Sequence, residues 1–75
     1  MRPDDILQHL RQRPFRPFRL VVLETTGYEV RHPESAMVGR STVTLAAPPG
    51  PLAGHEVVIA LLHITRIEPL VAAEN

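Results

Sequence analysis

The chain has 75 residues and a mass of 8.4 kDa, which allows one small domain whose folding hides only about 60% of its surface. It contains no cysteine, so neither disulfides nor thiolate metal sites can supplement a thin hydrophobic core, which leaves packing quality or self-association as the source of stability. Eight arginines balance eight acidic residues, which excludes the broadly basic surface of non-specific nucleic-acid binders. Without cysteine or an apolar run of membrane-spanning length, we expect a soluble cytoplasmic protein.

The neutral total conceals a charge gradient along the chain. Residues 1–20 carry five arginines against two aspartates, a net +3, and residues 21–75 carry a net −3. The basic segment could bind phosphate or an acidic partner, because arginine offers a planar fork of donors, or it could lie against the acidic remainder of the protein. The candidate binding residues in this segment are Arg11, Arg13, Arg16 and Arg19.

The pattern predicts a short helix over residues 1–13, with Pro3 at its start and a narrow stripe of Ile6, Leu7 and Leu10. Prolines at 14 and 17 predict an extended arm after it.

Alternation with period two follows over 18–24, and a turn over 25–27 with Gly27 at positive φ then leads into a second strand over 28–31.

The second half of the chain alternates between turns and strands. We expect one turn of helix within 33–39, a third strand over 41–46, a proline- and glycine-rich loop over 47–54, and strands over 56–62 and 63–69. Residues 1–70 form the domain and 71–75 a loose tail. A helix followed by five short strands is the element order of a five-stranded antiparallel SH3-like or Sm-like small barrel.

The expected fourth strand is apolar on both faces. Its alternating residues form two sets, so either the N-terminal helix or another subunit covers the outward set. We therefore expect a homo-oligomer. The candidate interface residues are Val57, Val58, Ile59, Leu61 and Leu62.

Three segments carry a resemblance to a group of uncharacterised short bacterial proteins. PFRPFRLVV, YEVRHPE and LLHITRIEPL resemble that group's PFxPFR opening, RHPE-like segment and hydrophobic-TRIE ending, over about residues 3–70. The resemblance implies a single module without an established activity.

A second resemblance is architectural. ALLHITRIEP is similar to the last two strands of bacterial Sm-like RNA chaperones, where a Tyr-Lys-His stretch helps line an RNA-binding pore. His63 matches the histidine of that stretch, whereas Leu61 and Leu62 replace its stacking ring and its cation.

The remaining polar residues give no catalytic or metal-binding pattern. The four histidines lack paired ligand spacing, so no metal or other cofactor is expected. His32 with Glu34 is a candidate pH-sensitive or ligand-facing pair, and His63 is expected to be partly buried and bonded to backbone. Ser35, close to His32 in sequence, lacks the surrounding loop of a nucleophile.

The sequence favours a non-enzymatic, self-associating protein-interaction module. An Sm-like RNA-binding protein is the alternative.

Overall fold

The computed structural model describes residues 1–46 and 55–70. Its elements in chain order are α1 (Pro3–Leu10), β1 (Phe18–Val22), β2 (Thr26–Val30), a 3₁₀ turn η1 (Pro33–Ser35), β3 (Ala36–Val38), β4 (Thr42–Ala46), β5 (Glu56–Ala60), a second 3₁₀ turn η2 (Leu61–His63) and β6 (Ile64–Pro69). The predicted loop over 47–54 and the predicted tail over 71–75 lie outside the described residues.

Helix α1 begins where its sequence predicts. Pro3 occupies the first turn, where no backbone donor is needed, and the Asp5 carboxylate accepts a hydrogen bond from the Arg2 N–H at 3.3 Å. Ile6 is fully buried, while Leu10 packs at the margin of the core. The helix is therefore held by its docked apolar stripe, because eight residues would not stay helical alone.

The first sheet has the strand order β2–β1–β6, with both pairs antiparallel. Phe18 and Leu20 of β1 face inward and are buried, whereas Arg19 and Val21 face outward, as the alternation predicts. A bulge separates Val21 from Val22 opposite β6 and leaves Thr65 without a ladder partner; its hydroxyl donates to the Val21 carbonyl at 3.2 Å.

The predicted turn between β1 and β2 is wrong by two residues. The Thr25 N–H donates to the Val22 carbonyl at 3.1 Å, so the central residues are Leu23 and Glu24, with φ of 53° and 63°. Two successive positive values are the φ pattern of a type I′ turn, which suits the twist of a hairpin. Gly27 lies in β2 instead, paired with Val21.

The second sheet has the strand order β3–β4–β5, again antiparallel throughout. Val43 and Leu45 of β4 face inward and are buried. Strand β3 lies within the segment predicted to form one turn of helix. Only η1 is helical there, and Ala36–Val38 pairs with β4.

The predicted five-stranded barrel is also wrong, although the chain is mainly β with one N-terminal helix. Six strands form two separate three-stranded sheets in the described residues, and neither sheet closes on itself. The chain crosses between the sheets through η1, where Pro33 has no N–H to donate, and through η2. Both crossings interrupt the ladders that a closed barrel requires.

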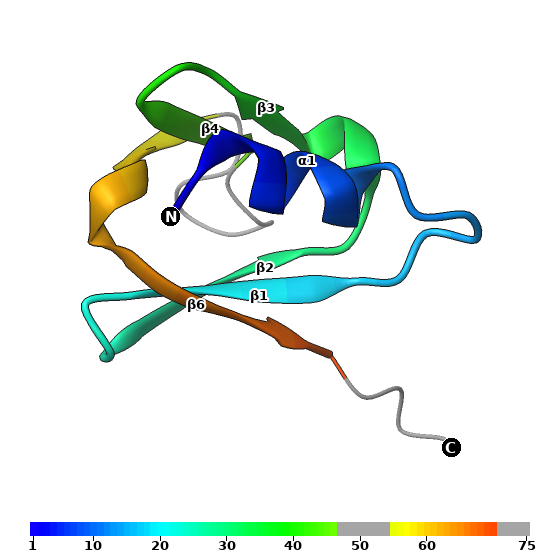
Figure 1. The fold of residues 1–75 in the computed structure, drawn as a ribbon, viewed down its shortest axis with the longest axis horizontal. Coiled ribbons are helices and arrows are strands. Elements are labelled where there is room, and N and C mark those ends of the chain that lie inside the picture. Colours follow the sequence, from blue (N-terminus) through cyan, green and yellow to red (C-terminus); the bar gives the residue numbers. More distant parts are fainter. Residues whose placement is uncertain (47–54, 71–75) are drawn as a thin grey trace.

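The core lies between the two sheets, and α1 borders it on one side (Figure 1). Ile6 joins buried residues from both sheets, so the helix faces the interior and does not cover the outer face of either sheet. The buried cluster is Ile6, Phe18, Leu20, Val30, Val43, Leu45, Ile59, Leu61 and Ile64. Among the described helices, none combines the length and apolarity that crossing a bilayer demands.

Candidate protein-interaction surface

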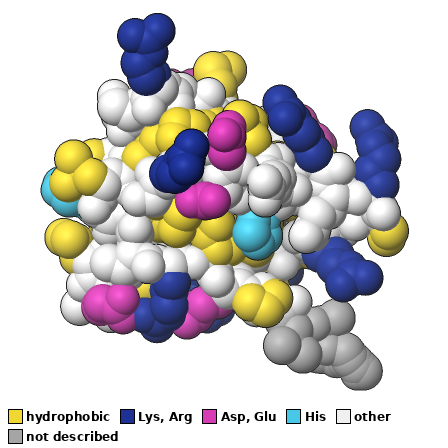
Figure 2. Space-filling model, viewed as in Figure 1, with side chains coloured by type: hydrophobic (Ala, Val, Ile, Leu, Met, Phe, Trp, Pro, Cys, Tyr) yellow, Lys and Arg dark blue, Asp and Glu magenta, His cyan; other side chains and the backbone are white. Residues whose placement is uncertain are grey.

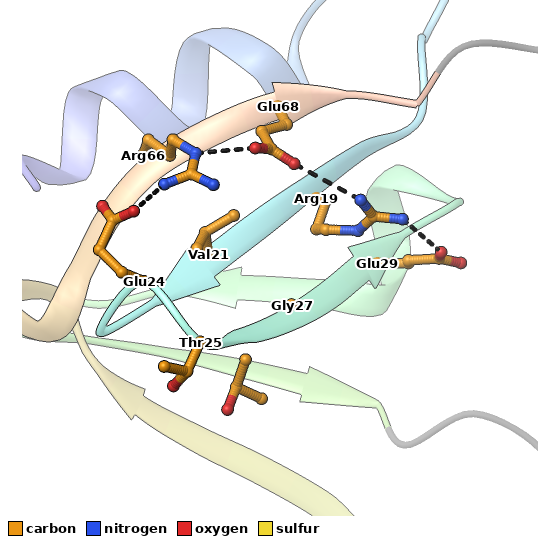
Figure 3. A pocket seen from close by; sticks show the side chains of 9 residues that line it. Arg19, Val21, Glu24, Thr25, Gly27, Glu29, Arg66 and Glu68 are labelled. Carbon is orange, nitrogen blue, oxygen red and sulfur yellow. Dashed lines mark hydrogen bonds and ion pairs between the residues drawn. The ribbon is translucent and has the colours of Figure 1, made fainter.

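The outer face of sheet β2–β1–β6 carries a row of alternating charges. Glu29, Arg19 and Glu68 lie directly opposite one another on the three adjacent strands. The Arg19 guanidinium contacts Glu29 at 3.3 Å and Glu68 at 3.4 Å, so one cation bridges both neighbouring strands (Figure 3). Opposite charges at directly paired positions stabilise a sheet.

The row continues at both ends as a chain of ion pairs. Arg31 contacts Glu29 at 2.8 Å, and Arg66 contacts Glu68 at 2.7 Å and also pairs with Glu24. Hydrogen bonds from Arg19 and Arg31 lower the pKa of Glu29, and those from Arg66 and Arg19 lower the pKa of Glu68. Acidic and basic side chains alternate along the lower edge of the molecule, where this sheet lies (Figure 2).

A shallow hollow of about 360 Å³ lies among these ion pairs. Val21 lines it and is only 5% exposed although it faces outward, between Arg19 and Arg66 (Figure 3). Arginine stems can cover apolar surface while their charged heads stay in water. Each arginine and glutamate lining this hollow already has a partner within the lining or at Arg31, so the hollow offers a ligand no uncompensated charge.

The outer face of sheet β3–β4–β5 has the opposite chemistry. Met37, Thr44 and Val58 lie opposite one another across its three strands, and we call them the outer row. Met37 is 75% exposed and Val58 is 63% exposed. Glu56 is the sole charged residue among the outward positions of these three strands as described, and it stands at the beginning of β5.

The five candidate interface residues divide between the inside and the outside. Val57 is half-buried against the core, and Ile59 and Leu61 belong to the core, so they stabilise the chain that carries them. Val58 is exposed, and Leu62 in η2 is 78% exposed. The predicted strand ends at Ala60, after which η2 changes the direction of the chain.

The four candidate arginines are divided as well. Arg19 belongs to the ion-pair chain, whereas Arg11, Arg13 and Arg16 are exposed in residues 11–17, between α1 and β1. Basic side chains project at that end of the molecule (Figure 2).

The three aromatic residues do not form an exposed stacking platform beside these arginines. Phe15 packs against Phe18, with ring centroids 6.1 Å apart, and Tyr28 faces inward against the core. The stacking surfaces that single-strand binding uses are therefore occupied by the protein's own packing.

The histidine candidates lie apart from one another. His32 and Glu34 are both exposed at η1, where the His32 carbonyl accepts the Ser35 hydroxyl at 2.7 Å. The expected burial of His63 is wrong: its side chain is exposed, and its carbonyl accepts the Leu23 N–H at 2.9 Å. Across residues 1–46 and 55–70, no three His, Cys, Asp or Glu side chains are grouped to hold a metal ion.

Met37 is the exposed apolar residue of this candidate surface that sequence reasoning missed. It lies in a strand of three residues between η1 and Gly39, too short for alternation to reveal its face. The apolar run from Ala36 to Val38, which follows Pro33 and Ser35, was the available signal. Comparison with family models, curated proteins and solved structures finds no match for the chain.

Proposed function

We propose that this protein is a non-enzymatic interaction module that associates with a second copy of itself through β5 and the outer row. The observation that carries the proposal is the exposure of Val58, an apolar residue at 63% in the middle of a strand. The sequence analysis gave two candidates for covering the outward-facing residues of β5, the N-terminal helix and another subunit. Because Ile6 anchors α1 in the core, the helix does not cover this face, which favours another subunit.

The contrast between the two sheets supports the proposal. On sheet β2–β1–β6 the outward-facing Val21 is covered, and the charges around it are paired with one another. On sheet β3–β4–β5 the outward-facing Val58 has only Thr44 beside it in the row, followed by the exposed Met37. Exposed apolar patches on soluble proteins mark contact surfaces.

The charge of this face favours a second copy over an oppositely charged partner. A face that carries strong net charge repels its own copy, whereas the outward positions of the three strands as described carry one charge, Glu56 at the start of β5. Two copies related by a two-fold axis present the same patch to each other, so an uncharged apolar patch is self-complementary.

The contacts of the polar side chains favour a protein-binding function over a catalytic one. The Ser35 hydroxyl donates to a backbone carbonyl and not to an imidazole, and three glutamates, two in the first sheet and one in its β1–β2 turn, are paired with arginines. Nucleophilic catalysis requires a hydroxyl or thiol held against a base.

The test is light scattering behind a sizing column at tens of micromolar, on the wild type, Val58→Lys and Leu23→Lys. The wild type is expected to be at least a dimer and Val58→Lys a monomer with an unchanged circular dichroism melt in dilute solution. Leu23→Lys is the matched control, because Leu23 is 60% exposed but lies in the turn before β2, outside sheet β3–β4–β5. A monomeric wild type, or equal dissociation of both variants, contradicts the proposal.

A further inference from the structure

Strand β5 is an open edge of its sheet. It pairs with β4 on one side, and no described residue pairs with it on the other. The β4–β5 ladder runs over all five residues without a bulge, so the edge is regular. An unpaired edge presents a row of backbone donors and acceptors that can pair with another strand.

The other three edges carry features that discourage such pairing. Strand β6 contains Arg66, Glu68 and Pro69, and β2 contains Glu29. Strand β3 has only three residues. Charges, proline and short length are the means by which proteins protect exposed edges.

Strand β5 lacks these features, apart from one charge at its first residue. The remaining residues, from Val57 to Ala60, include no charge and no proline, and three of the four are β-branched. Its centre, Val58, is the exposed residue on which the proposed self-association rests.

We propose that two copies of the chain associate by antiparallel pairing of β5 with β5 of the second copy, centred on Val58. This inference rests on the proposed function and places the contact at the β5 edge, where Val58 is the residue of the outer row that meets its own copy. With Val58 on the two-fold axis, all five residues of each strand enter the new ladder. A centre at Val57 or Ile59 pairs only three residues of the strand with each other.

This register also suits the side chains. Val58 lies opposite Val58 of the second copy, and the two shield each other on the outer face. Glu56 lies opposite Ala60 of the second copy, which separates the two Glu56 carboxylates by about 13 Å along the strands, at roughly 3.3 Å per residue. The result is one continuous sheet of six strands, three from each copy.

The absence of cysteine allows a direct test of the register. Residues directly opposite in an antiparallel pair have Cα atoms about 4.5–5.5 Å apart, within the span of a disulfide. Val58→Cys under mild oxidation is therefore expected to convert most of the protein to a disulfide-linked dimer on a non-reducing gel.

Ala60→Cys is the control, because it lies on the same face of the same strand as Val58. In the proposed register the two copies of residue 60 are about 13 Å apart, so it should remain almost entirely unlinked. Circular dichroism melts establish that both variants fold.

The outcomes separate the register from the function. Linkage at 58 and not at 60 supports the register. A wild type that is dimeric by light scattering, with no preference for linkage at 58, overturns the register and leaves self-association standing. A monomeric wild type overturns both.

Discussion

The side chain of Arg19 lies directly over Gly27 of the neighbouring strand. A Cβ atom on residue 27 would stand 2.5 Å from the Arg19 Cδ, closer than any ordinary contact. Gly27 does not have a positive φ; its lack of a side chain leaves the space in which Arg19 lies across the sheet between Glu29 and Glu68. The glycine and the charge row are therefore coupled.

A double-mutant cycle tests this coupling. In an Arg19→Ala background, Gly27→Ala should raise the free energy of unfolding by about 0.5–1 kcal/mol, because alanine is favoured over glycine within a strand. In the wild type the same change should give no such gain, since Arg19 must leave its place. Urea unfolding of the four proteins measures the cycle, and equal effects of Gly27→Ala in both backgrounds would show that the two residues are independent.

Two adjacent residues of β5 should respond oppositely to the same substitution. Ile59 is buried in the core, so Ile59→Asp should cost several kcal/mol and unfold much of the protein. Val58 faces outward, so Val58→Asp should change stability by no more than about 0.5 kcal/mol in dilute solution while abolishing association. Thermal melts of both variants at low protein concentration test this prediction. Similar losses of stability in the two variants would mean that the inward and outward faces of β5 are wrongly assigned.

The turn residue Leu23 should prefer glycine to alanine. At φ of 53° a side chain is strained by about 1–2 kcal/mol, and alanine keeps the Cβ atom that causes the strain. Leu23→Gly should therefore be more stable than Leu23→Ala by about 1 kcal/mol, the reverse of the usual order for the two residues. The melting temperatures of the two variants test this prediction. A higher melting temperature for Leu23→Ala than for Leu23→Gly would contradict the left-handed turn.

Stability should fall as the pH is lowered through the acid range. The arginine partners of Glu29 and Glu68 lower the pKa of each carboxyl in the folded state, so the unfolded chain binds more protons between the folded and unfolded values. The stabilisation is complete above the unfolded pKa of about 4.3 and is lost as the pH falls through the lower folded value.

Substitution of one carboxylate should weaken this pH dependence. Glu68→Gln removes a partner of both Arg66 and Arg19, so its melting temperature should fall less steeply below about pH 4.5. Glu34→Gln is the control, because Glu34 is exposed at η1 and forms no ion pair with the described residues. High salt should reduce the wild-type slope as well, since these pairs are solvent-exposed. Identical profiles for wild type and Glu68→Gln would exclude the ion-pair chain as the origin.

Local periodicity was sufficient to sort the residues of the longer strands into two faces. Alternation groups Phe18 and Leu20 on one face of β1 and separates Ile59 from Val58 along β5. It did not show which face of β5 is buried, because both faces are apolar and Ile59 was counted among the interface candidates. Successive side chains of a strand point to opposite faces wherever the strand lies, so this information is present in a few neighbouring residues. The start of α1 at Pro3 is equally local.

The local sequence pattern did not predict the position of the β1–β2 turn or the short strand β3. Gly27 was the natural choice for a positive φ, yet Leu23 and Glu24 adopt it because the register of β1 with β2 places them at the turn. Met37 lies in a strand of three residues whose pairing partner is the distant strand β4. In both places the pairing of strands overrides residue preference.

The amino-acid sequence by itself determined that the chain is a small, mainly β protein with an N-terminal helix, and which side chains of its longer strands share a face. Only the tertiary structure decided that Arg19 stands between Glu29 and Glu68, that the described strands form two separate sheets, and that no described strand pairs with β5 on the side away from β4. The physical reason is that a side chain's face depends on residues within two or three positions, whereas a strand's neighbours depend on backbone pairing between segments far apart in the chain.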